Sequence, residues 1–282
     1  MAAAATPAFS TAMLILAGRV LRRRRETDRP HSIVQLADTL QSMDVALRKG
    51  DCAALRALLR DTGGAVHDDA MLLFTASCAC APQFADTAAA NVLVTHADER
   101  QLDVNGVGDR IRPLYAALVA PIDAHDRLRI ARWLLERGAD ANAANDVGGE
   151  LDAGATPIHA CCEHEVLELL LAHGADVHCG DMSGQTALHH YVLCGAADDS
   201  TLRCIATLLE HGADVNACSR RRRTPLHYAA AFIHDPRDAL LLVATLLHGG
   251  ADAHARDAAG LTPRTHALRY AAFSVSRAAL AV

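Results

Sequence analysis

Residues 212–230 read Gly-Ala-Asp-Val-Asn-Ala-Cys-Ser-Arg-Arg-Arg-Arg-Thr-Pro-Leu-His-Tyr-Ala-Ala, and they contain the signals from which the fold can be predicted. Gly212 follows an apolar run and is suited to end a helix, because glycine enters the left-handed conformation without steric cost. Thr224 is a good helix N-cap, and Pro225 loses no useful N–H at the first helical position. The small and polar residues between them favour a turn. The stretch therefore predicts the end of one helix, an extended turn, and the start of the next helix.

Both signals recur along the second half of the chain. The tripeptide Gly-Ala-Asp begins at Gly138, Gly174, Gly212 and Gly250, at intervals of 36, 38 and 38 residues. Threonine helix starts stand at Thr156-Pro157, Thr186, Thr224-Pro225 and Thr262-Pro263. In three units, ten residues separate the aspartate from the next threonine, as from Asp214 to Thr224. Two motifs that keep one register indicate a tandem repeat.

Each repeat is predicted to contain an extended finger, a short helix, a polar turn and a longer helix. In the clearest copy, the short helix covers residues 226–232 and the longer helix covers residues 239–248, which are rich in leucine. Helices of this length are stable only when they pack on neighbours. The expected fold is therefore all-α, with each helix pair stacked on the next.

The pattern Thr-Pro-Leu-His-x-Ala with a downstream Gly-Ala-Asp-Val-Asn resembles the ankyrin repeat, and residues 212–216 and 224–230 carry it most fully. Weaker copies of its parts lie at residues 44–60, 103–105 and 112–117. The resemblance implies an all-α ankyrin-repeat solenoid of about six repeats with a C-terminal cap. The expected organisation is a leader at residues 1–35 and a solenoid at 36–282, divided into degenerate repeats (36–108), clear repeats (109–258) and a cap (259–282).

Three units are longer than a 33-residue repeat by about five residues. We expect these residues to lie between the two helices, at 121–127, 194–200 and 232–238. Long inter-helix segments, with helix starts reading Leu-His-His-Tyr or Leu-His-Tyr-Ala, resemble poxvirus ankyrin-repeat proteins. Those proteins usually end in an F-box-like segment that recruits a ubiquitin ligase. No such segment is expected here, because the cap uses most of the residues after Asp252.

The composition agrees with a helical core built from small residues. Hydrophobic residues make up 51% of the chain, aromatic residues 4% and charged residues 21%, which excludes disorder over most of its length. The net charge of −6 argues against a nucleic-acid-binding protein. The nine cysteines are odd in number and scattered, which predicts a reduced, intracellular protein.

The leader at residues 1–35 is predicted to be disordered or a short helix with an arginine-rich end. Its apolar core, residues 12–18, is far too short to span a bilayer. The positive charge of Arg22–Arg25 follows that core, whereas a signal peptide carries its charge before the apolar segment. The cytoplasm is therefore the expected location. A weak membrane anchor and a nuclear-import patch remain alternatives to a solvated leader.

A cluster of potential zinc ligands lies at residues 159–164, which read His-Ala-Cys-Cys-Glu-His. These ligands occupy fewer than two helical turns and cannot all converge on one tetrahedral ion. His159, His189 and His227 recur at one position of the repeat, where we expect them to hydrogen-bond backbone groups of their own and the adjacent repeat. No phosphate loop, nucleophile elbow or carboxylate pair stands out. We therefore expect no catalytic residue, no metal site and no cofactor. The residues expected to act only as structural motif are Thr156, Pro157, His159, Gly174, Thr186, His189, Gly212, Asp214, Thr224, Pro225, His227, Gly250, Thr262 and Pro263.

Arg220–Arg223 forms a run of four like charges in the finger before Thr224. Arg222 falls where the neighbouring fingers hold Gly184 and Gly260, so its place in the turn is expected to cost stability. A run kept at that cost suggests contact with an acidic or phosphorylated surface, while a solvated charged turn is the alternative. The predicted contacts at finger tips and first-helix ends are Asp181, Met182, Gln185, Arg220, Arg221, Arg223, Phe232 and Asp257.

These features favour a non-catalytic protein-binding module whose concave face docks a protein partner. The leading hypothesis is a monomeric viral modulator that binds host proteins, and neither nucleic acid nor a membrane is an expected partner. The alternatives are a substrate adaptor of a ubiquitin ligase, with a ligase-binding segment that is not recognisable, and a cellular ankyrin scaffold protein.

Overall fold

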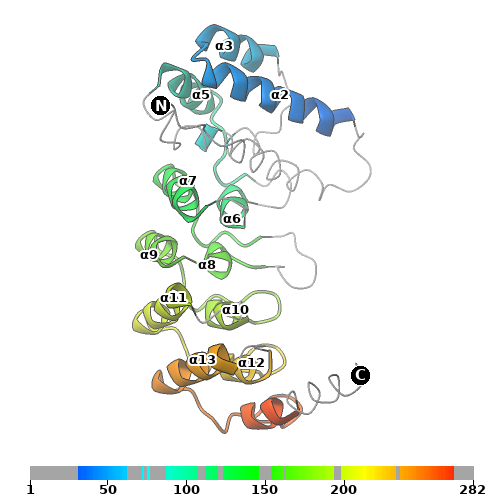
Figure 1. The fold of residues 1–282 in the computed structure, drawn as a ribbon, viewed down its shortest axis with the longest axis vertical. Helices are drawn as coiled ribbons and strands as arrows, with labels where there is room; N and C mark the ends of the chain where they lie inside the picture. The colour runs from blue at the N-terminus through cyan, green and yellow to red at the C-terminus, as the bar shows by residue number, and fades with distance from the viewer. Residues whose placement is uncertain are drawn as a thin grey trace. The chain divides into compact units, whose positions relative to one another are not determined.

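The named elements of the computed structural model are all α-helices (Figure 1). It describes residues 31–61, 72, 75–76, 87–106, 112–119, 123–145, 154–161, 163–193, 198–232 and 236–269. Most of the predicted leader, with Arg22–Arg25, and the last residues of the predicted cap, 270–282, lie outside this description. The chain divides into two units, residues 1–145 and 146–282.

Local sequence signals set the helix ends in the first unit. Its helices are α2 (His31–Arg48), α3 (Cys52–Asp61), α5 (Ala88–Glu99), α6 (Pro113–Leu118) and α7 (Ala124–Glu136). Asp51 begins α3, because its carboxylate accepts hydrogen bonds from the N–H groups of Ala53 and Ala54. Thr87 begins α5 in the same way by accepting from Ala90 at 3.1 Å. Helix α2 packs on α3, α3 packs on α5, and α6 packs on α7.

The second unit consists of stacked helix pairs, which confirms the predicted all-α ankyrin-repeat fold. Its helices are α8 (Pro157–Ala160), α9 (His164–Ala172), α10 (Ala187–Leu193), α11 (Asp199–Glu210), α12 (Pro225–Phe232) and α13 (Pro236–His248). The first helices α8, α10 and α12 contact one another in series, and so do the second helices α9, α11 and α13 (Figure 1). Residues 263–269 form a further helical segment. Each helix pair therefore packs against the neighbouring pairs, as expected for a stack of repeats.

The turn at the end of α11 shows why glycine recurs in the Gly-Ala-Asp motif. Gly212 has a φ of 83°, a left-handed conformation that residues with a side chain rarely adopt. This conformation lets the N–H of Ala213 donate to the carbonyl of Leu208 at 2.9 Å and closes the helix end. The chain then leaves the helix directly into the next finger.

The inserted residues were predicted to lie between the helices, and this prediction is wrong in part. Helix α7 begins at Ala124, α11 at Asp199 and α13 at Pro236, so the ends of all three segments belong to the second helices. These helices have 13, 12 and 13 residues, whereas α9, in the unit without the insertion, has nine. The early starts of α7 and α11 have a clear cause. Asp123 and Asp198 cap the helices by accepting from backbone N–H groups three residues later, each at 2.8 Å.

Leu208 offers a direct measure of the stacking between second helices. It lies in α11, which contacts both α9 and α13, and its side chain is completely buried. We expect Leu208→Ala to lower the free energy of unfolding by about 3 kcal/mol, measured by urea denaturation followed by circular dichroism. The control is Leu240→Ala in α13, where the leucine is 70% exposed and the change should stay within about 0.5 kcal/mol. Equal losses in the two variants would contradict the assigned burial.

Among the described residues, no helix combines the length and the apolar character that crossing a membrane requires.

Candidate protein-binding surface

Three equivalent turns, here called the fingers, precede helix α10, helix α12 and the helical segment 263–269. They comprise residues 181–185, 219–223 and 257–261. Each finger is closed by a backbone hydrogen bond from its first N–H to its last carbonyl, at 2.9, 2.9 and 3.0 Å. The first side chain of each finger adds a second closure by accepting from the backbone N–H four residues later. Each finger is therefore closed by two hydrogen bonds between its own first and last residues.

The fingers are also joined to one another. The N–H of Arg220 donates to the carbonyl of Ser183 at 2.8 Å, and the N–H of Ala258 donates to the carbonyl of Arg221 at 2.9 Å. These bonds make the three fingers one continuous row. Side chains at the tips of this row are held on a rigid support, which suits a binding surface.

The repeated histidine links each first helix to the finger that follows. Nδ1 of His159, His189 and His227 accepts from the N–H of the threonine that begins the helix, at 3.1 Å in each case. Nε2 donates to the carbonyl that ends the following finger, namely that of Gln185, Arg223 or Leu261, at 3.0–3.2 Å. An acceptor at Nδ1 and a donor at Nε2 require the neutral imidazole.

Burial keeps these histidines neutral. It is the main cause that lowers the pKa of His159 and of His189 to about 4, and it also lowers the pKa of His227. Protonation of any of them would remove the acceptor that holds the threonine N–H. The histidines are thus structural parts of the surface.

A second set of polar pairs fixes each finger to its own first helix, and sequence reasoning missed it. Asp181 accepts from His190 at 3.0 Å, and Asp257 accepts from His266 at 2.8 Å. Burial opposes ionisation of Asp257, but the bonds from His266 and from two backbone N–H groups prevail and lower its pKa to about 2. Each pair spans nine residues, and in the middle finger Ser219 and Tyr228 hold the same two positions. This nine-residue spacing, which the three fingers share, is the feature of the sequence from which the pairs could have been predicted.

The predicted contact residues fall into different environments. Met182 is 57% exposed, and Arg220 and Arg221 are exposed at the finger tips. Asp181 and Asp257 are buried, and their carboxylates are engaged inside the fold. Gln185 and Arg223 are half-buried, and the guanidinium of Arg223 lies 3.5 Å from the carboxylate of Asp257. Phe232 ends α12, and its side chain lies outside the described part of the structure. The contact role of all eight residues stays a prediction, and of the eight, Met182, Arg220 and Arg221 have exposed side chains.

Arg222 adopts the conformation that its alignment with the glycines predicts. Its φ is 55°, while Gly184 and Gly260 have φ values of 70° and 75° at the equivalent positions. An arginine in this left-handed region is strained, because its Cβ crowds the backbone.

We therefore expect Arg222→Gly to raise the free energy of unfolding by about 1 kcal/mol, measured by urea denaturation. The matched control is Arg221→Gly, which removes the same charge at a position without positive φ. The control should lower stability by about 0.5 kcal/mol, because glycine gains freedom in the unfolded chain. A similar gain in both variants would assign the effect to charge relief instead of backbone strain.

Two potential zinc ligands in the cluster at residues 159–164 contact other side chains of the fold. The thiol of Cys161 lies 2.8 Å from the hydroxyl of Tyr191, and Nε2 of His164 lies 2.9 Å from the hydroxyl of Thr207. Cys162 is outside the described residues. Within the described ranges, no group of three or more His, Cys, Asp or Glu side chains could hold a metal ion.

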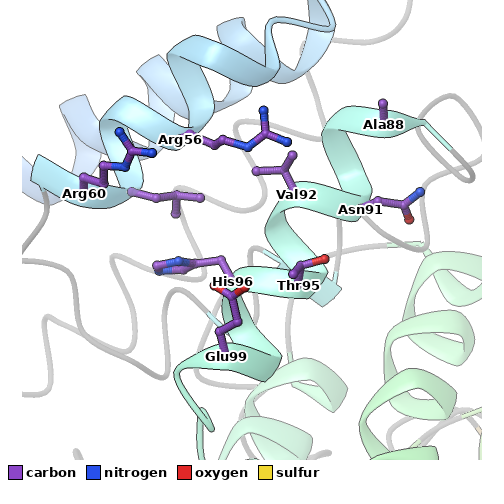
Figure 2. Close-up of a pocket in the computed structure, with 9 residues that line it drawn as sticks. Arg56, Arg60, Ala88, Asn91, Val92, Thr95, His96 and Glu99 are labelled. Carbon is purple, nitrogen blue, oxygen red and sulfur yellow. The ribbon is translucent and has the colours of Figure 1, made fainter.

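The first unit has a groove of about 620 Å³ between α3 and α5, where no site residue was predicted. Figure 2 shows Arg56 and Arg60 extending from α3 across from His96 of α5. The other lining residues are Leu59, Ala88, Asn91, Val92, Thr95 and Glu99. Burial and the nearby Arg100 lower the pKa of His96, which favours its neutral form. The lining mixes both signs of charge, so it favours no particular class of ligand.

The family model for ankyrin repeats (three copies) matches residues 124–216 and, in an overlapping second match, residues 158–257. No curated protein matches the chain, so the poxvirus resemblance rests on the sequence pattern described above. The matched region includes the fingers at 181–185 and 219–223, the repeated histidines and helices α8 to α13. The chain therefore contains ankyrin repeats, detected over residues 124–257.

Proposed function

We propose that the chain is a non-catalytic protein-binding module that docks its partner on the row of fingers and the adjoining first helices. Ankyrin repeats indicate a protein–protein interaction module, because stacked repeats present an extended surface of variable side chains. One observation carries the assignment to this surface. Backbone bonds and buried histidines hold the row rigid, while Met182 and the arginines at its tips project into solvent.

The proposal includes a protein partner with an acidic or phosphorylated surface, because the exposed arginines provide guanidinium groups that suit either anion. It further includes a monomeric viral protein that modulates host proteins in the host cytoplasm, with the nucleus as the alternative location. A substrate adaptor of a ubiquitin ligase and a cellular ankyrin scaffold are the competing functions. Co-purification of cullin machinery would favour the adaptor.

Affinity purification from cell extract, quantified by mass spectrometry, tests the surface. The test variant combines Met182→Ser, Arg220→Ser and Arg221→Ser, all at exposed positions. The control variant combines Asp199→Ser and Arg203→Ser, an exposed ion pair on α11. We expect partners captured by the wild type to be lost from the test variant and kept by the control. Partners kept by both variants would move the binding surface away from the fingers, and a wild type without partners would refute the binding function.

A further inference from the structure

We propose that the fingers bind an extended acidic peptide segment, with carboxylates at Arg220, Arg221 and Arg222 and an apolar side chain at Met182. This inference rests on the proposed function, because it names the chemistry of the partner at the same surface. The three arginines are called the basic tip below.

The basic tip has an unusual backbone conformation. Arg222 keeps a φ of 55° where both neighbouring fingers have glycine. Strain of this kind persists at sites where the side chain has a use, since glycine would relieve it at no steric cost. The neighbouring fingers share the closure and the histidine anchors, so the turn itself does not need an arginine at this position.

The basic tip also carries three positive charges close together. All three arginines of the basic tip are exposed, and none forms an ion pair with any residue that the structure describes. Arg223, the fourth residue of the run, instead approaches Asp257 of the next finger. Adjacent like charges repel one another, and a chain of carboxylates would neutralise them. The basic tip therefore offers positive charge to an outside ligand.

The spread of the three side chains favours several carboxylates over one phosphate group. Arg222 is the only one of the three arginines with a positive φ, so successive residues of this turn differ in backbone conformation and their side chains leave the backbone in different directions. A single phosphate needs donors that converge on it, whereas a row of Asp or Glu residues can meet each guanidinium separately. An acidic segment is thus the better match.

Met182 supplies an apolar position beside the basic tip. It is 57% exposed, and the next residue, Ser183, accepts the backbone hydrogen bond from Arg220. Its flexible thioether can adapt to an apolar side chain. Neighbouring repeats lie about 10 Å apart, and an extended peptide advances about 3.3 Å per residue. The ligand should therefore carry its apolar residue about three positions from its first carboxylate.

Fluorescence anisotropy with a labelled peptide tests this arrangement. The probe reads Leu-Ser-Gly-Glu-Glu-Glu-Gly, and its comparators replace the three Glu by Gln, the three Glu by phosphoserine, or Leu by Ser. We expect the Gln peptide to bind at least about 10-fold more weakly, the phosphoserine peptide no more tightly than the probe, and the Ser peptide about 3-fold more weakly. Equal binding of the Gln peptide would overturn the proposal. Binding of the phosphoserine peptide more than about 10-fold tighter would replace the acidic segment by a phosphorylated one.

Variants of the full chain locate the site. Combined Arg220→Ser and Arg221→Ser should weaken binding of the probe at least about 10-fold, and Arg222→Gly about 3-fold although it makes the protein more stable. Arg203→Ser, a paired arginine on α11, should leave binding unchanged. Because Arg222→Gly is expected to raise the free energy of unfolding, a loss of binding in this variant would not come from unfolding. Unchanged binding in the arginine variants would overturn the proposal. A further outcome separates this proposal from the proposed function. If affinity purification still shows loss of partners from the variant that combines Met182→Ser, Arg220→Ser and Arg221→Ser, while the probe fails to bind, the acidic ligand is wrong and the protein-binding function stands.

Discussion

Acidification from pH 7 to pH 4 is expected to lower the free energy of unfolding of the second unit by about 6 kcal/mol. His159 and His189 are the cause, because burial lowers the pKa of each from 6.5 to about 4 in the folded chain. Between these two pH values the unfolded chain binds protons that the folded chain does not. Stability is therefore complete above about pH 6.5 and falls as the pH approaches 4, by about 3 kcal/mol for each histidine.

Asp257 acts in a separate, lower pH window. Its pKa is lowered to about 2 in the folded chain, so its stabilising effect is complete above about pH 4 and is lost as the pH falls toward 2. The decline between pH 6.5 and pH 4 thus reports on the buried histidines His159 and His189, and on His227, whose pKa burial lowers in the same direction. Urea denaturation followed by circular dichroism at pH 7, 6, 5 and 4 measures it.

The control for the acid effect is the combined variant His159→Gln and His189→Gln. Glutamine has a donor and an acceptor but does not titrate, so this variant should be less stable at pH 7 and show a much flatter decline toward pH 4. A second control, His173→Ala, removes an exposed histidine at the end of α9 and should keep the wild-type decline. A decline as steep in this double variant as in the wild type would contradict the role of His159 and His189.

Local signals explain why the repeat could be predicted from the sequence. A threonine N-cap, a proline at the first helical position and a glycine after the last each act within a few residues. The helices predicted at 226–232 and 239–248 are therefore present as α12 (Pro225–Phe232) and α13 (Pro236–His248). The positive φ of Arg222 could be predicted for a similar reason, because the repeat aligns it with two glycines.

The lengths of the second helices depend on whether the added residues form a loop or extend the helix, and the repeat pattern does not show which of the two they form. Residues after Asp123 and Asp198 were expected to be loop because they exceed the ankyrin period. Both aspartates instead cap a helix, and the added residues extend α7 and α11 by about one turn. An N-cap is effective only if the following residues pack as a helix, and that depends on tertiary contacts.

The pairs that hold the fingers required the folded chain. Asp181 and Asp257 were predicted to contact a partner because they occupy finger positions, but their carboxylates turn inward to His190 and His266. A charged residue in a turn is usually solvated, so its type alone does not indicate burial. The contact residues that remain at the surface, Met182, Arg220 and Arg221, have no such inward partner among the residues described.

His189→Ala is expected to lower the free energy of unfolding by about 4 kcal/mol at pH 7. The imidazole is completely buried, and its ring meets the ring of Tyr228 edge-on at 5.5 Å. Its removal leaves a cavity, which costs about 2 kcal/mol. It also leaves the N–H of Thr186 without a partner and removes one of the two hydrogen bonds that the carbonyl of Arg223 accepts, at about 1 kcal/mol each. The control is His173→Ala, which should cost less than about 0.5 kcal/mol at an exposed position.

His189→Ala also tests whether the conformation of the basic tip depends on helix α10, which carries His189. The carbonyl that His189 holds belongs to Arg223, which closes the finger through its bond to the N–H of Ser219. Loss of the histidine should therefore loosen this finger before the stack unfolds, so the N–H of Arg222, bonded to Ser219 at 2.7 Å, should exchange with deuterium faster. The N–H of Gly260 in the next finger, held by the separate anchor from His227, should exchange at its wild-type rate. Equal acceleration at both positions would mean that the unit opens as a whole, and that no single histidine positions the finger in front of it.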